Sequence, residues 1–361
     1  MLQPFDVLPR TTAEPDAEAI WTDDRTLSWA ELEERSRRFA QGLRSVGVDA
    51  GDHWALLARN RFEWAELSIG NGRAGARSVP LNWHLTAREI AELLEDSGSK
   101  LLVVADELAD VGRAAAAIVG LDQILVLGDD YEAWLMRQSS DPLEDGPLGS
   151  PLQYTGGTTG RSKGVIRSDQ AGRASSLAET YSRWGTLTDA RVSRCCCAPR
   201  RTTHSVVRCS ARRSPEAARW RSWMRGSRAN LAVIAERQVV GTAMVPTQFI
   251  RLLKLEESIR NRFDVSSLRW VLHTAAPCPK WVKQAMIEWF GPVITELYGS
   301  SEGVGPVIAT APEWLERPGT VGRATAVLEL SILDDDGDDL PARRGRDDLC
   351  PPHRRRAVVP R

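Results

Sequence analysis

The sequence predicts an α/β fold with two doubly wound sheets, helices over them, and a partial small β-subdomain towards the end. Short apolar runs alternate with segments of helical periodicity along two stretches of the chain, which is typical of parallel sheets. Apolar residues make up 42% and charged residues 26% of the 361 residues, as in ordinary globular proteins with a sizeable core. We therefore expect a globular chain of two or more subdomains.

The first stretch supplies the elements of the first sheet. Thr86 is a good N-cap because Glu89 follows three residues later. Asp141–Ser150, rich in proline, glycine and acids, is expected to be a linker. The expected strands are His53–Arg59, Arg77–Pro80, Lys100–Ala105 and Gln123–Leu127, and the expected helices are Arg61–Gly72, Thr86–Asp96, Glu107–Val119 and Tyr131–Ser139.

The second stretch repeats the alternation after residue 229. We find no internal repeat of fixed period. The expected strands are Val239–Met244, Leu268–Thr274, Val293–Tyr298 and, later, Ala326–Leu333, and the expected helices are Leu231–Arg237, Pro246–Glu257 and Pro279–Phe290.

Two stretches, 191–228 and 342–361, follow no such pattern. The first contains eleven arginines and one acidic residue, the second contains seven arginines, and five of the six cysteines lie in the two together. Arginine supplies 42 of the 47 basic residues, which suggests GC-rich coding DNA, so we hypothesise that both stretches are frameshifted. Since they combine little apolar content with positive charge, we expect them to be disordered.

Three interpretations of these stretches are disfavoured: a zinc site, a nucleic-acid-binding segment and a disulfide scaffold. Cys195, Cys196 and Cys197 are adjacent and lack the spacing of a zinc site. The arginines come without an aromatic stacking motif, and the net charge of the chain is −1, so we expect no nucleic-acid partner. A disulfide scaffold does not fit a chain of this size in a reducing compartment.

The most informative segment is the Gly/Thr-rich loop at residues 154–164. Its glycines allow backbone N–H groups to approach an anion closely, its threonines add hydroxyl donors, and Lys163 adds a positive charge. It is not a Walker A loop, because Lys163 follows Ser162 and precedes Gly164. The loop taken alone also fits a glycine-rich hairpin turn. The candidate phosphate-binding residues are Thr155, Gly156, Gly157, Thr158, Thr159, Gly160 and Lys163.

This loop resembles the phosphate loop of the adenylate-forming enzymes, whose usual form is [YF]-T-S-G-T-T-G-x-P-K-G. A second match in the expected order is Tyr298–Glu302, similar to the family's Y-G-x-T-E motif. Further matches are Leu27–Leu32, Gly51–Asp52, Pro80–Asn82, Ala275–Pro277 and Gly319–Gly322. The run from His273 to Pro279 is most similar to bacterial fatty-acyl-CoA synthetases. The resemblance implies the N-terminal domain of this family.

The resemblance also implies a chemistry and a set of roles. Members activate a carboxylic acid with ATP to acyl-AMP, with Mg²⁺ bound, and transfer the acyl group to CoA. In that scheme Lys163 assists the phosphate loop, Glu302 binds Mg²⁺ and Ser301 donates to the α-phosphate or the acyl carboxylate. The adenine is framed by Ala276, Pro277, Tyr298 and Gly299. Core packing is the alternative for Tyr298, a solvated carboxylate for Glu302, and either the acyl pocket or a strand-end core position for His273.

Some departures from the family lead us to expect an impaired ligase. The chain ends before the family's T-G-D motif, its D-R hinge and its C-terminal lid domain with the catalytic lysine, and 191–228 replaces the segment with the pocket gate. Two alternatives stay open: an amino-acid-activating adenylation domain and a non-catalytic nucleotide-binding or interaction remnant. The acyl chain length and oligomeric state do not follow from this sequence.

The expected organisation divides the chain at residues 190, 228, 324 and 341. No apolar run approaches the length of a membrane span, and the first ten residues lack the order of a secretory signal. We expect a cytoplasmic protein, and peripheral association with a membrane stays open. The expected segments are a first α/β subdomain at 1–190, the aberrant segment 191–228, a second α/β subdomain at 229–324, the start of a β-subdomain at 325–341 and the aberrant tail 342–361.

Overall fold

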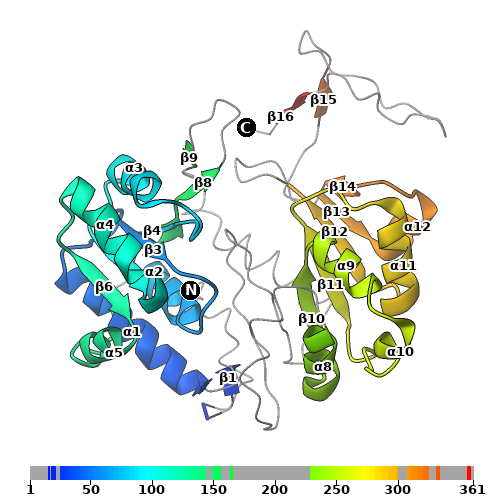
Figure 1. Cartoon of the computed structure of the whole chain (residues 1–361), viewed down its shortest axis with the longest axis horizontal. Helices are drawn as coiled ribbons and strands as arrows, with labels where there is room; N and C mark the ends of the chain where they lie inside the picture. The colour runs from blue at the N-terminus through cyan, green and yellow to red at the C-terminus, as the bar shows by residue number, and fades with distance from the viewer. Residues whose placement is uncertain are drawn as a thin grey trace.

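The computed structural model describes residues 15–16, 18–21, 25–143, 147, 149–155, 163–165, 228–299 and 307–324, together with the backbone of residues 331–333 and 356–358. Figure 1 shows two lobes side by side, one built from the described residues up to 165 and the other from those after 227. Each lobe contains a five-stranded sheet. The predicted α/β class is confirmed.

The sheet of the first lobe is parallel throughout. Its strands lie in the order β6-β5-β3-β4-β7, and every neighbouring pair runs in the same direction. Because the earliest strand of the sheet is central, the connections wind to both sides of it. The strands are β3 (His53–Leu57), β4 (Arg77–Pro80), β5 (Leu102–Ala105), β6 (Ile124–Leu127) and β7 (Ser150–Pro151).

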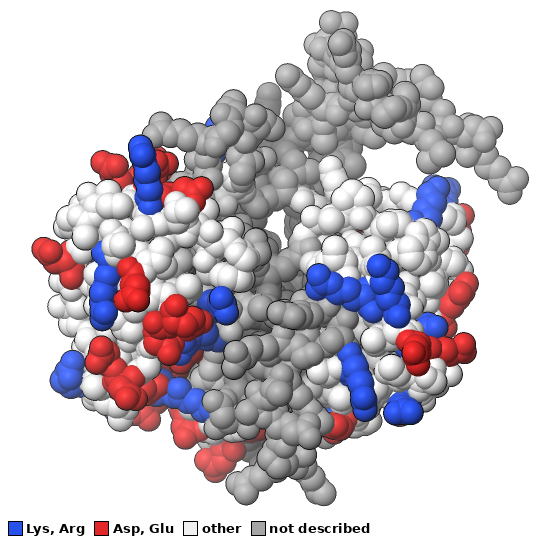
Figure 2. Space-filling view, in the orientation of Figure 1, with Lys and Arg blue, Asp and Glu red and all other residues white. Residues whose placement is uncertain are grey.

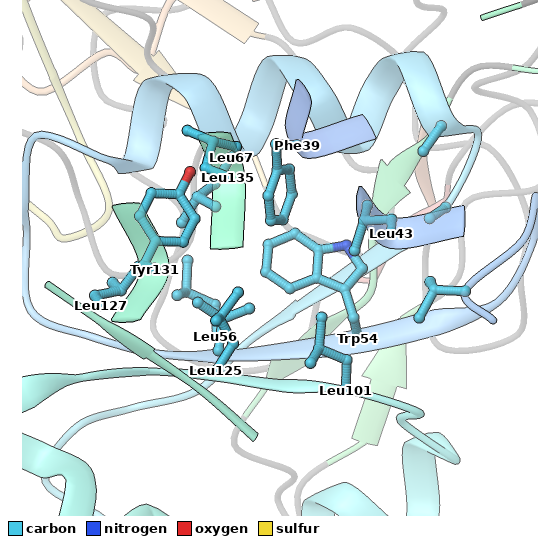
Figure 3. Close-up of a cluster of buried hydrophobic side chains, with 14 of the residues drawn as sticks. Phe39, Leu43, Trp54, Leu56, Leu67, Leu101, Leu125, Leu127, Tyr131 and Leu135 are labelled. Atoms are coloured by element: carbon cyan, nitrogen blue, oxygen red, sulfur yellow. The ribbon is translucent and has the colours of Figure 1, made fainter. Parts of the chain in front are cut away.

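Separate apolar cores lie on the two faces of this sheet. One contains Phe39 and Tyr131, which Figure 3 shows converging on Trp54 of β3; the rings of Phe39 and Trp54 meet edge to face at 5.2 Å. The other core includes Ile90 and Ala115. The helices are α1 (Trp29–Ser45), α2 (Trp64–Ala74) and α5 (Asp129–Met136) with the first core, and α3 (Ala87–Ser97) and α4 (Ala109–Val119) with the second.

The sheet of the second lobe is mixed. Its order is β10-β11-β12-β13-β14, with β10, β11 and β12 parallel and the last two strands antiparallel. One core cluster joins this sheet to its helices. The strands are β10 (Gly241–Met244), β11 (Trp270–Thr274), β12 (Ile294–Tyr298), β13 (Val307–Thr310) and β14 (Arg323–Ala324), and the helices are α8 (Arg228–Arg237), α9 (Pro246–Leu253), α10 (Glu257–Arg260), α11 (Lys280–Phe290) and α12 (Ala311–Glu316).

Three antiparallel strand pairs and the one-turn helix Asp106–Leu108 complete the described structure. The strand pairs are β1 (Glu18–Trp21) with β2 (Thr26–Ser28), β8 (Gln153–Thr155) with β9 (Lys163–Val165), and β15 (Ser331–Leu333) with β16 (Arg356–Val358). The first links the lobes, because Arg237 of α8 lies 4.2 Å from the centre of the Trp21 ring and Trp21 packs against the second-lobe core.

The structure differs from the sequence-based expectations in a few places. A helix expected over Pro246–Glu257 is two helices, α9 and α10. α1, β13, α12 and β14 were not expected, and the prediction of parallel pairing does not extend to β13 and β14. Ser150, expected in a linker, begins β7, and Arg356–Val358 forms β16 where no structure was expected. Arg228, the last residue of the stretch 191–228 that was expected to be disordered, begins α8, whereas 191–227 and the rest of the tail lie outside the described residues.

The match at Gly319–Gly322 has a steric basis in the second lobe. Gly322 has φ +99°, and a Cβ atom there would lie 1.8 Å from the carbonyl oxygen of Ile308 on β13. Gly319 has φ +104°, but its Cβ would meet only the flexible side chain of Lys280, at 2.7 Å from Cε. Only glycine therefore fits at position 322, where backbone meets backbone.

We expect Gly322→Ala to lower the free energy of unfolding of the second lobe by about 2–3 kcal/mol, from backbone strain and overpacking. Gly319→Ala is the matched control, since it has the strained φ but a neighbour that can move, and should cost about 1 kcal/mol. Urea titrations followed by tryptophan fluorescence measure both values. Equal losses in the two variants would contradict the proposed clash with Ile308.

Candidate nucleotide-binding site

Four of the candidate site residues lie together at one edge of the second sheet. β11 and β12 are parallel neighbours with Thr274 opposite Leu297, so the chain leaves both strands at the same carboxyl edge. In open α/β sheets ligands bind outside this edge. The residues that follow or end the strands there are exposed: Ala276, Pro277, Tyr298 and Gly299.

Two local features distinguish this edge from an ordinary pair of loops. Ala275, directly after β11, has φ +78°, a conformation that costs a non-glycine residue about 1–3 kcal/mol and that is concentrated at functional sites. Tyr298 is 45% exposed, so its ring is not packed into the core, and a free aromatic face is available to a flat ligand. We refer to Ala276, Pro277, Tyr298 and Gly299 as the adenine frame, after the role that the family resemblance implies for them.

The two described ends of the candidate phosphate loop belong to the first lobe. Thr155 of β8 pairs with Lys163 of β9 across an antiparallel hairpin, and the side chain of Lys163 is exposed. The chain enters β8 from β7, which runs parallel to β4. Thr155 therefore lies towards the carboxyl edge of the first sheet, and the hairpin interpretation and the phosphate-loop interpretation are compatible.

The base of this hairpin is attached to its lobe through Tyr154. The hydroxyl of Tyr154 donates to the carboxylate of Asp96 near the end of α3, and a Cβ at Gly164 would lie 3.3 Å from the Tyr154 ring. Burial, followed by the hydrogen bond to Asp96, raises the pKa of Tyr154. Its phenol is therefore a neutral donor that holds β8 against α3.

The remaining site predictions fall outside the described residues. These are Gly156, Gly157, Thr158, Thr159, Gly160, Ser301 and Glu302. Carboxylate oxygen is a suitable Mg²⁺ ligand, so Glu302 stays a predicted ligand. Within the described ranges, no group of three or more His, Cys, Asp or Glu side chains could hold a metal ion.

A buried charged cluster lies under the adenine frame and was not predicted. The Nζ atom of Lys283 on α11 lies 2.6 Å from Oε2 of Glu296 on β12, and Nε2 of His273 on β11 lies 3.4 Å from the same oxygen. Lys283 and His273 are 0% exposed and Glu296 12%. His273 is fully buried near the end of β11, which fits the interpretation of this residue as a core residue at a strand end.

The charges in this cluster perturb one another. Burial raises the pKa of Glu296, but the nearby His273 imidazole and the hydrogen bond from Lys283 lower it by more, so the pKa lies below its ordinary value. Burial lowers the pKa of Lys283 despite the Glu296 carboxylate. A sequence signal existed for Lys283, because it precedes Met286, Ile287 and Phe290 at helical spacing and so lies on the apolar face of α11.

Residues 9–346 match the protein family described as AMP-binding enzyme. The chain belongs to this family. Its two motif-bearing segments, at 154–164 and 298–302, both lie inside the matched range. The adenine frame and the hairpin of β8 and β9 thus lie within the domain that matches the AMP-binding enzyme family.

Two curated relatives illustrate the similarity. The fatty acid–[acyl-carrier-protein] ligase ScoC of Streptomyces coeruleorubidus is 35% identical over 157 residues, which are 42% of this chain and 30% of the relative. The long-chain-fatty-acid–CoA ligase FadD13 of Mycobacterium tuberculosis is 27% identical over 350 residues, which are 91% of this chain and 66% of the relative. The chain thus spans less than two-thirds of these relatives' lengths.

Solved structures of the family have the same fold. The inhibitor-bound N-terminal domain of FACL13 from Mycobacterium tuberculosis superposes with a TM-score of 0.73 at 24% identity, covering 93% of this chain and 85% of that domain. ATP-bound MatB from Rhodopseudomonas palustris superposes with a TM-score of 0.74 at 24% identity, covering 94% of this chain and 67% of that chain. The predicted N-terminal-domain architecture is confirmed. In the described part of the chain, no helix is long and apolar enough to span a membrane.

Cys278 lies in the loop between the adenine frame and α11 of this AMP-binding enzyme. Burial and the nearby Glu296 carboxylate raise the pKa of its thiol from 9.0 to about 11. Because only the thiolate reacts, Cys278 should be poorly reactive although it is partly exposed.

We expect iodoacetamide near neutral pH to alkylate Cys278 about 100-fold more slowly than an unperturbed thiol, in proportion to the thiolate fraction. Mass spectrometry of the Cys278 peptide over time gives the rate. The same chain in urea is the control, where Cys278 should react at the ordinary rate. Equal rates in the folded and unfolded chain would contradict the shielded environment.

Proposed function

We propose that this protein derives from an enzyme that activates a carboxylic acid with ATP, with a fatty acid as the favoured substrate, and passes the acyl group to the thiol of CoA. The supporting observation is that the two family motifs leave the carboxyl edges of the two sheets, one in each lobe. ScoC and FadD13, the relatives described above, are both named as ligases of fatty acids.

The proposed first step forms acyl-AMP. A carboxylate oxygen attacks the α-phosphorus of ATP, and the bond to the β-phosphate oxygen breaks to release pyrophosphate. Positioning and charge neutralisation supply most of the catalysis in such transfers. Thr155 to Gly160 would hold the β- and γ-phosphates with Lys163, the adenine frame would hold the base, Glu302 would bind Mg²⁺, and Ser301 would donate to the α-phosphate or the acyl carboxylate.

In the proposed second step the CoA sulfur attacks the acyl carbonyl carbon and AMP leaves. We propose that the 361-residue chain performs the overall reaction slowly, because the stretch 191–228 departs from the family's sequence where the pocket gate is expected. Acyl-CoA formation at a rate typical of acyl-CoA synthetases would contradict this part of the proposal.

The function is tested by ATP–pyrophosphate exchange with fatty acids and with amino acids, together with MgATP-induced thermal shift. We expect exchange that depends on a fatty acid, and a loss of about 10²- to 10³-fold in Lys163→Ala, since one phosphate contact is removed. Lys254→Ala is the matched control, as Lys254 is an exposed lysine at the end of α9.

Other outcomes select the alternatives. Exchange that depends on an amino acid would favour an adenylation domain. A thermal shift with MgATP but no exchange would favour a non-catalytic nucleotide-binding protein. The absence of any effect of MgATP on the wild-type chain would overturn the proposal.

A further inference from the structure

The buried cluster of His273, Lys283 and Glu296 connects the three segments that surround the adenine frame. His273 is on β11, two residues before the strained Ala275. Glu296 is on β12, two residues before Tyr298 and therefore on the same face of the strand. Lys283 is in the first turns of α11, which begins just after Pro279. A single carboxylate thus contacts groups from both strands and the helix.

The cluster is enclosed on its other sides by aromatic rings. The ring of Phe249 on α9 meets His273 edge to face at 5.6 Å, and the Nζ atom of Lys283 lies 5.1 Å from the centre of the Trp314 ring on α12. Glu296 accepts a hydrogen bond from Lys283 at 2.6 Å. The carboxylate is therefore held in one position, by a directional contact and by packing around its partners.

The need for a stable core does not by itself explain why charged groups are buried in this cluster. Burying a carboxylate and an ammonium group carries a desolvation cost that close pairing only partly offsets, and apolar replacements are often as stable. Directional, charge-assisted hydrogen bonds instead fix the relative position of the elements that they join. This cluster lies directly under the exposed frame. Fixing the relative position of these elements would therefore affect a ligand bound to the frame.

We propose that Glu296 is a positioning residue that aligns the adenine frame by tying β11, β12 and α11 together beneath it. This inference rests on the proposed function, since it takes the frame to hold the adenine of ATP. Glu296 does not touch the nucleotide. It acts through the Ala275–Pro277 loop and through Tyr298, so its loss should weaken recognition of the base and leave recognition of the phosphates intact.

The test compares Glu296→Gln with Glu66→Gln by calorimetric titration of the 361-residue chain, using MgATP and magnesium tripolyphosphate as ligands. Glu66 is the matched control because it is also a buried carboxylate in an ion pair, but it lies on α2 in the other lobe. All titrations are made at a temperature at which the variants are folded. This separates a general loss of stability from a local effect on the frame.

We expect Glu296→Gln to weaken MgATP binding by about tenfold or more, as for other residues that orient a binding group, and to change tripolyphosphate binding by less than about twofold. Glu66→Gln should leave both affinities within about twofold of the wild type. Unchanged MgATP binding in Glu296→Gln, or equal weakening of both ligands, would overturn the positioning role alone. A wild-type chain that binds neither ligand would overturn the proposed function and this inference together.

Discussion

Replacing Arg35 by methionine is expected to lower the free energy of unfolding of the first lobe by about 3–5 kcal/mol, the usual cost of breaking a buried ion pair from one side. Arg35 on α1 is 11% exposed and Glu66 on α2 is 0% exposed. The guanidinium donates to Oε1 of Glu66 at 2.9 Å, and the hydroxyl of Tyr131 donates to the same oxygen at 2.7 Å. Without Arg35 the buried carboxylate keeps its hydrogen bond from the Tyr131 hydroxyl.

Two variants control this prediction. The double variant Arg35→Met with Glu66→Leu removes both charges of the pair and should recover part of the loss, because apolar replacement of a buried pair is often neutral. The recovery is incomplete because Tyr131 loses its acceptor and Glu132 loses its hydrogen bonds from Arg35. Arg88→Met removes an arginine whose side chain is 87% exposed and lies 3.7 Å from Glu92, and it should cost less than about 1 kcal/mol. Urea unfolding at neutral pH gives all three values. Similar losses for Arg35→Met and Arg88→Met would show that Glu66 tolerates burial without its partner.

The first lobe was the part of the fold best predicted from sequence, because its signals are local. Thr86 and Glu89 form the capping box expected at the start of α3, and β4 has the predicted bounds. α1 was missed although its buried residues Leu32, Ser36, Phe39, Ala40 and Leu43 recur at helical spacing; a serine among them and many charged neighbours obscure the pattern.

The second lobe contains features that local sequence patterns do not predict, namely the direction of two strands and a buried ion pair. Strand direction depends on where the chain goes between strands. Only eight residues separate β12 from β13, too few for the crossover that a parallel pair needs, and the two strands pair antiparallel. The common position of Ala276, Pro277, Tyr298 and Gly299 at one sheet edge could be predicted, because they end or closely follow two strands that were expected from the sequence. The cluster beneath them was not predicted: helical spacing places Lys283 on the apolar face of α11, but its pairing with Glu296 depends on the register of β11 and β12 and on how α11 packs against them.

Figure 2 shows acidic and basic side chains interspersed over the visible face of the first lobe, as the balanced composition predicts. Surface charges of this kind contribute little to stability individually. The ion pairs with large expected effects join different helices and strands. Such contacts between distant parts of the chain are the hardest to predict from the sequence. In both lobes they join a helix to the element that it covers.

Lys283→Met in the second lobe is expected to have a similarly large effect, about 3–5 kcal/mol at neutral pH, because Glu296 would stay buried with only His273 beside it. In the wild type burial raises the pKa of Glu296, but the nearby His273 imidazole and the hydrogen bond from Lys283 outweigh burial, so the pKa lies below its ordinary value of 4.5. The contribution of Glu296 to stability is therefore complete above pH 4.5 and is lost as the pH falls through its lowered pKa.

The pH dependence of the loss distinguishes this electrostatic cause from a packing defect. In Lys283→Met, burial acts on Glu296 with His273 as the remaining group that lowers its pKa, so the pKa of Glu296 should be higher than in the wild type. The electrostatic part of the loss should therefore grow as the pH rises through the interval between the two pKa values. The difference between wild type and variant should therefore be smallest near about pH 4 and largest near about pH 7. Urea titrations at both pH values measure this difference in the free energy of unfolding. The titration of groups that the two proteins share cancels from the difference. A difference independent of pH would mean that Lys283 acts through its apolar stem and its contact with Trp314, and not through the charge of Glu296.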